Sequence, residues 1–305
     1  KTISDRAFYN SSITSVYIPQ TVESIGQYAF ANTFKLTGNI VIPSKTVTIG
    51  DYAFHQSAFN GTLTLEEGVQ NLGVAAFAGC SKVTGDLVIP NSVTNIGDAT
   101  FRKSTFTGSL NIGNGLTSIP TYAFCDCNSF KGKITIGENV KSIGDSAFEG
   151  CAGFTGNLII PDKVKSIGES AFMNCTGFTG YLSLGNAIAS LGSYAFSSFT
   201  KTPKASSGYI YDYQKLFNTV YCKALVPPTL PHYTLRATVG DAEVYATFGW
   251  YSTLGNSLVR LHDTGYGSST YMGARSLHLL IPMDCFSKYR NAIGWNFDLI
   301  EEVEF

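Results

Sequence analysis

Hydrophobic positions recur along most of this chain with a long and nearly constant period. The clearest marker is an Ala-Phe pair, in which Thr100 replaces the alanine once. Its phenylalanines are Phe8, Phe30, Phe54, Phe77, Phe101, Phe124, Phe148, Phe172 and Phe196. Successive members stand about 24 residues apart, and self-similarity at a fixed period of this length indicates a protein built from stacked repeats.

Each unit contains a short stretch in which inward and outward positions alternate. Ile40 and Ile42 stand two residues apart, and Pro43 follows them. A period of two is that of a β-strand with one face in the core. Pro ends the strand because it has no N–H for the ladder. The pattern therefore predicts a short strand in each unit, with an outward residue such as Val41 between two inward ones.

The second half of each unit has the spacing of a short helix. Ile143 precedes Ala147 by four residues, and Cys151 follows Phe148 by three. These offsets suit one or two helical turns with an inward face. An acidic residue such as Asp145 would favour the N-terminus of those turns. Since no unit of this length can bury its own apolar side chains, we expect the units to stack into a solenoid.

Cysteine shares one column of the repeat with Ser and Thr. The cysteines that stand three residues after a Phe are Cys80, Cys127, Cys151 and Cys175. A column that accepts all three residue types requires a small side chain, so we interpret it as a buried row of free thiols and hydroxyls. Disulfides or a metal site are the alternative, but the cysteines at 125 and 127 lack the second ligand pair of a zinc site. We expect no metal and no cofactor.

The motif IPxxVxxIGxxAFxxC, which recurs in variants between Ile89 and Cys175, resembles the BspA-type leucine-rich repeat. That repeat occurs in surface proteins of Bacteroides-like bacteria and of some parasitic protists. The resemblance implies an α/β fold: a right-handed, strand-rich leucine-rich-repeat solenoid with short helical turns, eight to nine repeats of roughly 23 to 24 residues and a C-terminal cap. It also implies secretion or surface anchoring and an adhesive role. It carries over no catalytic residue, because the motif consists of core positions.

The period ends near residue 200, which predicts a solenoid over 1–202 and a C-terminal capping segment over 203–305. The stretches 220–230 and 277–303 resemble the closing segment of bacterial proteins of this family. Residues 231–275 between them exceed a simple closing turn, and the alternation in EVYATF predicts a β insertion there. At the other end, Ile3 fits a core column whose preceding strand is missing. We therefore expect the natural precursor to continue upstream.

The net charge and the lack of known catalytic motifs argue against several classes of function. A formal net charge of -1 gives no basic patch for nucleic acid or anionic membrane, and no apolar run is long enough for a transmembrane helix. The four histidines are scattered, and no hydrolase, metalloprotease or phosphate-loop motif occurs. A pocket holding His262 or Cys285 with a strongly perturbed pKa would argue for catalysis. We predict a non-enzymatic and monomeric protein.

Function is expected on surfaces whose residue types the repeat does not fix. The outward strand residues suit a broad contact with a host extracellular-matrix or surface protein, or with a glycan. The aromatic residues of the insertion are a rival site. The candidate binding residues are Tyr17, Val41, Thr64, Val88, Asn111, Thr135, Ile159, Tyr181, Ser183, Trp250, Tyr251 and Tyr266. The alternative is a structural spacer that holds another domain away from the cell surface.

Overall fold

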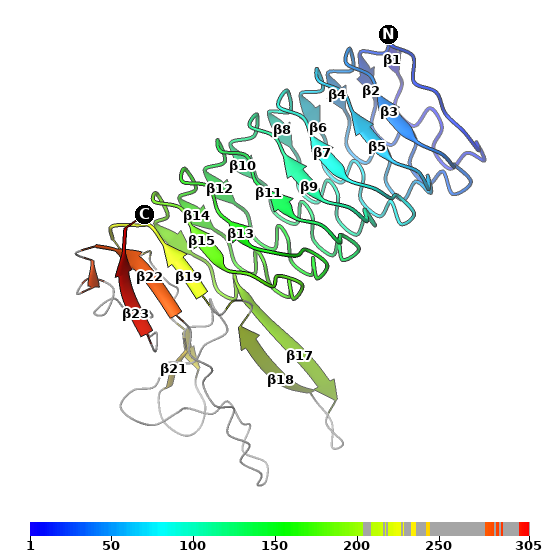
Figure 1. Cartoon of the computed structure of the whole chain (residues 1–305). Helices are drawn as coiled ribbons and strands as arrows, with labels where there is room; N and C mark the ends of the chain where they lie inside the picture. Colours follow the sequence, from blue (N-terminus) through cyan, green and yellow to red (C-terminus); the bar gives the residue numbers. More distant parts are fainter. Residues whose placement is uncertain are drawn as a thin grey trace.

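A computed structural model shows that the repeats stack into a β-solenoid of about nine coils (Figure 1). The structure describes residues 1–203, 209–215, 217, 219–226, 228, 233–235, 242–244, 278–283, 285, 286, 288 and 299–304. A coil is one passage of about 24 residues around the solenoid axis, the length of one stacked repeat. The predicted stacking of short repeats is confirmed, and the N-terminal coil lies at the end of the solenoid opposite the C-terminal strands.

The strand predicted from alternating positions is present and is called here the first strand of each coil. These strands are β3 (Ile40–Ile42), β5 (Leu63–Leu65), β7 (Leu87–Ile89), β9 (Leu110–Ile112), β11 (Ile134–Thr135), β13 (Leu158–Ile159) and β15 (Leu182–Leu184). They pair in parallel in the orders β3-β5, β7-β9-β11 and β13-β15. In β3, for example, Ile40 and Ile42 are buried while Val41 between them is exposed.

A second short strand follows in each coil, ending on the aliphatic column that precedes the Ala-Phe pair. These second strands are β1 (Thr2–Ile3), β2 (Ser24–Ile25), β4 (Thr48–Ile49), β6 (Asn71–Leu72), β8 (Asn95–Ile96), β10 (Ser118–Ile119), β12 (Ser142–Ile143), β14 (Ser166–Ile167) and β16 (Ser190–Leu191). They pair in parallel in the orders β1-β2-β4-β6-β8 and β10-β12-β14-β16. The register matches equivalent residues, so Ile143 lies beside Ile167.

The expected helical turns around the Ala-Phe pair are wrong. Tyr28 and Asn32, which flank Phe30, have φ angles of 55° and 59°, whereas an α-helix requires negative φ at every residue. The segment consists of successive turns instead, and Ala31 N–H donates to the Tyr28 carbonyl three residues back at 3.1 Å. Alternate N–H groups point to the next coil: Phe30 N–H donates to the Ala53 carbonyl at 2.7 Å. The turns therefore form a third row of hydrogen bonds between coils.

The phenylalanines of the Ala-Phe pairs form a continuous stack through the core. Neighbouring ring centroids, from Phe8 to Phe196, lie 4.9 to 5.5 Å apart, with interplanar angles of 2° to 14°. Phe148 in the middle is fully buried, whereas Phe8 at the N-terminal end is 38% exposed. The predicted core columns are confirmed, and each ring is covered by the coils on both sides except at the N-terminal end.

The small column is confirmed as buried thiols and hydroxyls, and the structure supplies its reason. All seven cysteines are free and buried. Cys151 Sγ–H donates to the Phe124 carbonyl of the preceding coil at 3.1 Å, and Ser104 Oγ–H donates to the Phe77 carbonyl at 2.6 Å. The column therefore supplies a small second donor to a carbonyl that already accepts a backbone N–H, as the Phe124 carbonyl accepts Cys127 N–H at 3.1 Å. Burial raises the pKa of the Cys127 thiol to about 12.

Beyond the last full coil, three further strands extend the row of first strands. They are β19 (Thr219–Cys222), β22 (His278–Pro282) and β23 (Leu299–Val303), in the parallel order β13-β15-β19-β22-β23. Two antiparallel hairpins also occur: β17 (Ser197–Pro203) with β18 (Tyr209–Lys215), and β20 (Tyr233–Leu235) with β21 (Ala242–Val244). In Figure 1 the β17–β18 hairpin extends away from the coils.

Candidate binding surfaces

The outward residues of the first strands form a continuous column on one side of the solenoid. Register places Val41 beside Thr64 and Val88 beside Asn111. Neighbouring members are therefore about 4.8 Å apart along the axis, which is the usual distance between paired strands. We define the outward column as the exposed residues Tyr17, Val41, Thr64, Val88, Asn111, Thr135 and Ile159. Tyr17 lies in the equivalent segment of the coil before β3, where no strand is formed.

Four members of the outward column are large apolar residues with much of their surface in solvent. Tyr17 is 80% exposed, Val41 44%, Val88 50% and Ile159 55%. Single exposed apolar residues are ordinary on protein surfaces, but aligned ones form a patch of the kind found at interaction sites. The solenoid does not need them, because Thr and Asn occupy the same position in the neighbouring coils.

The outward column ends at the last full coil, which differs from the sequence expectation for two residues. Ser183 in β15 is buried, with only 7% of its surface exposed, and Tyr181 is half-buried. The cause is β19, which pairs with β15 and places Tyr221 beside Ser183. The Tyr221 ring meets the Tyr181 ring edge-on at 4.9 Å. Ser183 is therefore not accessible to a partner in the way that Val88 is.

The residues that precede the outward column have a structural role. Asn39 Oδ1 accepts the Thr62 N–H of the next coil at 2.9 Å, and Asp86 Oδ1 accepts the Ser109 N–H at 2.7 Å. Asn157 Oδ1 accepts an N–H in the same way. These three side chains join one coil to the next, whereas Thr62 and Lys133 occupy the same position in other coils. Asp145 acts likewise: its Oδ1 accepts the backbone N–H of the next coil at 2.8 Å and does not cap a helix.

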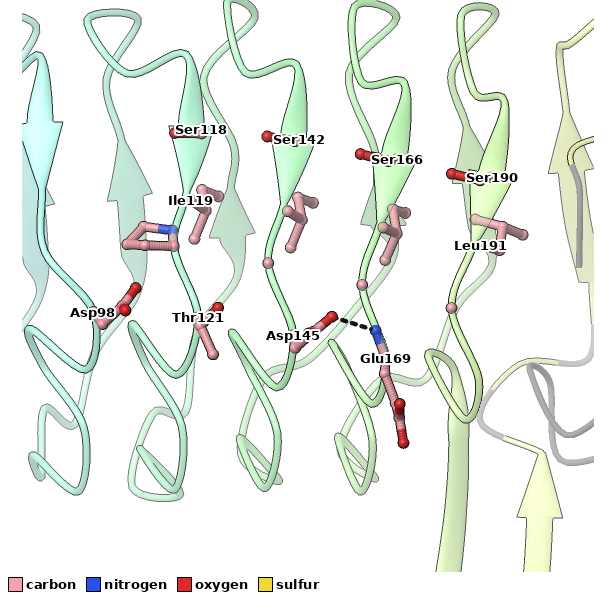
Figure 2. Close-up of a pocket in the computed structure, with 16 residues that line it drawn as sticks. Asp98, Ser118, Ile119, Thr121, Ser142, Asp145, Ser166, Glu169, Ser190 and Leu191 are labelled. Atoms are coloured by element: carbon pink, nitrogen blue, oxygen red, sulfur yellow. Dashed lines mark hydrogen bonds between the residues drawn. The ribbon is translucent and has the colours of Figure 1, made fainter. Parts of the chain in front are cut away.

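A shallow groove of about 610 Å³ runs across the second strands of the later coils (Figure 2). Its lining includes a row of serines, Ser118, Ser142, Ser166 and Ser190. Asp98, Asp145 and Glu169 lie along the other side, past the residue that follows each second strand, which is a glycine in these coils and Pro120 after β10. The groove offers hydroxyls and carboxylates for hydrogen bonds. It was not predicted from the sequence. The repeated sequence Lys-Ser-Ile-Gly-Asp/Glu at 141–145 and 165–169 was the available signal.

Among the residues that the structure describes, no group of three or more His, Cys, Asp and Glu side chains is placed to hold a metal ion. No helix among those residues has the length and apolarity needed to cross a membrane. Trp250, Tyr251 and Tyr266, the candidate residues of the insertion, lie outside the described residues.

Three solved structures similar to this chain are bacterial proteins. A leucine-rich repeat protein of T. pallidum is 28% identical, with a TM-score of 0.45; the match covers 50% of this chain and 71% of that one. A leucine-rich cell surface protein of Faecalibacterium prausnitzii is 26% identical over 59% of this chain and 56% of that one, with a TM-score of 0.39. A leucine-rich repeat protein of Bacteroides ovatus is 18% identical over 72% and 82%, with a TM-score of 0.28. No curated protein matches the chain.

The repeat itself gives the decisive comparison. The family model of the BspA type leucine-rich repeat region matches residues 1–131 and 128–209, with 6 copies of the repeat. These matches cover well over half of the chain and coincide with the coils that stack in the structure. The chain therefore belongs to the BspA-type leucine-rich repeat family.

Proposed function

We propose that this chain is a non-enzymatic recognition module, secreted or held at the outer cell surface, that binds a partner protein through the outward column. The observation that carries the proposal is the alignment of exposed Tyr17, Val41, Val88 and Ile159 at positions that the fold leaves free. Family membership supports a surface protein-interaction role. The partner class that fits is an extracellular-matrix or host surface protein.

The shape of the outward column favours a protein partner over a small ligand. It spans seven coils, from Tyr17 to Ile159, so at about 4.8 Å per coil its length approaches 30 Å. A stable protein interface needs about 800 Å² on each partner, and the strand row, about 30 Å long and about 10 Å wide, supplies roughly 300 Å² of it. We also propose that the solenoid over 1–202 carries this surface, while the segment over 203–305 closes its end.

A spacer is the second candidate, and the three rows of hydrogen bonds between coils favour it. These rows and the stacked Phe rings make the solenoid one elongated body, which suits a protein that separates another domain from a surface. The two functions differ in what the exposed residues do. A spacer tolerates their replacement, whereas a binder loses its partner.

The test is a binding screen of the purified chain against extracellular-matrix proteins, repeated with a variant that carries Val88→Ser and Ile159→Ser. Exposing two apolar side chains that a bound partner buries costs about 2 kcal/mol or more in total, which is roughly a 30-fold loss of affinity. The matched control carries Val47→Ser and Val74→Ser, because these valines are 39% and 37% exposed but lie outside the outward column. The proposal expects a loss in the first variant and none in the control.

A third variant lacking residues 231–275 separates the two candidate surfaces. Binding that survives in the Val88/Ile159 variant and disappears in the deletion would assign recognition to the insertion and contradict the proposal. Wild-type protein that binds no matrix protein would favour the spacer. A glycan array run in parallel would show whether the outward column selects sugars instead.

A further inference from the structure

One contact between coils lacks a hydrogen bond that closes the row of second strands elsewhere. In the other coils a glycine follows the second strand, and its N–H donates to the aliphatic residue of the preceding coil; Gly144 N–H, for example, donates to the Ile119 carbonyl at 2.8 Å. The glycines that form this bond are Gly26, Gly50, Gly73, Gly97, Gly144, Gly168 and Gly192. Pro120 stands at this position after β10 and has no N–H to donate. The contact between the coil of β7 and β8 and the coil of β9 and β10 is called here the Pro120 joint.

A second bond is missing from the Pro120 joint. In the next joint along the chain, Lys141 N–H donates to the Thr117 carbonyl at 2.8 Å. Among the described residues of the Pro120 joint, no equivalent bond runs from Thr117 N–H to the Thr94 carbonyl. The ladder of second strands is accordingly interrupted between β8 and β10. The side chain beside the gap is also less covered, since Ile96 is 6% exposed and Ile119 is 1% exposed.

The other interruptions of the strand ladders support proline as the cause. The row of first strands is interrupted between β5 and β7 and between β11 and β13. Pro90 directly follows β7, and Pro161 has the same repeat position after β13. Gly113 has this position after β9, where the ladder is intact, and its N–H donates to the Ile89 carbonyl at 2.9 Å. Each interruption therefore coincides with a proline where the ladder needs an N–H.

Proline at 120 also keeps the two coils apart sterically. The coils approach so closely at this repeat position that a Cβ added to Gly144 would lie 2.7 Å from the backbone N of Thr121 in the preceding coil. Proline has both a Cβ and a ring at this position, so the second strands cannot close to the distance that glycine allows. Glycine in the other coils shows that the fold does not require proline here.

The rest of the Pro120 joint is closed. The strands β7 and β9 pair in register, with Val88 beside Asn111. On the turns, Phe101 N–H donates to the Ala123 carbonyl at 2.8 Å. In the core, the rings of Phe101 and Phe124 stack at 5.4 Å with 5° between them. The two coils are therefore joined along the first strands and along the turns, and they are open along the second strands.

We propose that the Pro120 joint is a hinge at which two stiffer parts of the solenoid tilt relative to each other. The parts are the coils with the second strands β1 to β8 and those with β10 to β16, each held by an uninterrupted ladder of second strands. Local opening takes place where few backbone bonds hold a structure. Tilting about the closed rows changes the distance between β8 and β10. It also changes the curvature of the outward column between Val88 and Asn111, because this column lies on the first strands.

The test is a distance measurement by pulsed electron paramagnetic resonance on the full chain, with spin labels at Glu23→Cys and Lys141→Cys. Both residues are exposed and have equivalent repeat positions beside second strands. They are five coils apart, which is about 24 Å, and the Pro120 joint lies between them. The native cysteines are buried, so the labels react with the two introduced thiols. We expect a broad distribution of distances, and in Pro120→Gly a distribution narrower by roughly a third.

Pro161→Gly is the matched control, because it makes the same substitution at a joint outside the labelled span. It should leave the width of the distribution unchanged. Hydrogen exchange shows independently whether Pro120→Gly closes the row of second strands: the Thr117 amide should exchange about 10-fold more slowly or less than that in rate once its bond to the Thr94 carbonyl forms.

Three results would overturn the proposal. The first is a distribution that is equally wide in Pro120→Gly although the Thr117 amide has become protected, because a closed joint would then bend as much as an open one. The second is a Thr117 amide that stays unprotected in Pro120→Gly, since proline would then not be the cause of the gap. The third is an equal narrowing in Pro161→Gly.

Discussion

Replacement of Phe148 by alanine should destabilise the solenoid far more than replacement of Phe8. Phe148 is fully buried and stacks on Phe124 at 5.1 Å and on Phe172 at 4.9 Å. Truncating a buried Phe to Ala costs about 3 to 5 kcal/mol, since a cavity remains, and the two lost ring contacts are part of that sum. Phe8 stacks only on Phe30, at 5.0 Å, and is 38% exposed. Its truncation should cost about 1 to 2 kcal/mol.

Urea denaturation followed by circular dichroism measures the difference. With a slope near 3 kcal/mol per molar urea, the Phe148 variant should unfold at a midpoint about 1 to 2 M lower. The Phe8 variant should shift by roughly a third of that. Because stacked repeats can unfold in parts, hydrogen exchange should show the loss spreading to the coils on both sides of Phe148. Equal shifts for the two variants would refute the argument that each coil covers the ring of the next.

Three further predictions concern the small column and the joints between coils. Cys151→Ser should change the free energy of unfolding by less than about 1 kcal/mol, because the hydroxyl can still donate to the Phe124 carbonyl. Cys151→Val should cost about 1 to 3 kcal/mol, because the branched side chain overpacks the fully buried column and removes the second donor from that carbonyl. Urea titrations of both variants measure the difference. Burial raises the pKa of Cys127 to about 12 in the fold against an ordinary value of 9.0, so the unfolded chain loses its thiol proton first. The contribution of Cys127 to stability should be constant below pH 9 and should fall between pH 9 and 12, so the alkaline loss of stability should be smaller in Cys127→Ser. Gly168→Ala should lower the melting temperature by several degrees, since a Cβ there would lie 2.6 Å from the backbone N of Asp145 in the preceding coil. An unchanged melting temperature would contradict this close approach of the two coils.

The stacking of coils could be predicted from the sequence because every core column repeats, and one column such as Phe30, Phe54 and Phe77 suffices to set the register. The helical turns could not be excluded in this way. Tyr28 and Ala75 are left-handed in the structure, but neither residue type signals a positive φ as Gly or Asn does. The inward spacings of four and three residues are also compatible with both a helix and these turns.

The exposure of a candidate residue could be predicted where it depends only on the residue's position in the repeat. It could not be predicted where strands beyond the last repeat cover the residue. Val88 and Ile159 are outward because of strand alternation alone. The burial of Ser183 depends on Tyr221, which lies beyond the last repeat and has no repeat position to mark it. The stacking of Tyr28 on Tyr52 could have been predicted by aligning their column, because stacking in register brings equivalent residues into contact.

The side-chain and backbone bonds that join successive coils also determine how the chain responds to force. Most joints combine paired strands with the turn row, and several add an Asn or Asp oxygen such as Asn39 Oδ1 on the next backbone. The strand ladders are interrupted between β5 and β7, between β8 and β10 and between β11 and β13. Under tension at its ends, the solenoid should therefore open first at one of these joints. A single coil that peels away releases about 80 Å of extended chain. Such a protein can lengthen in regular steps under shear while its remaining coils stay folded.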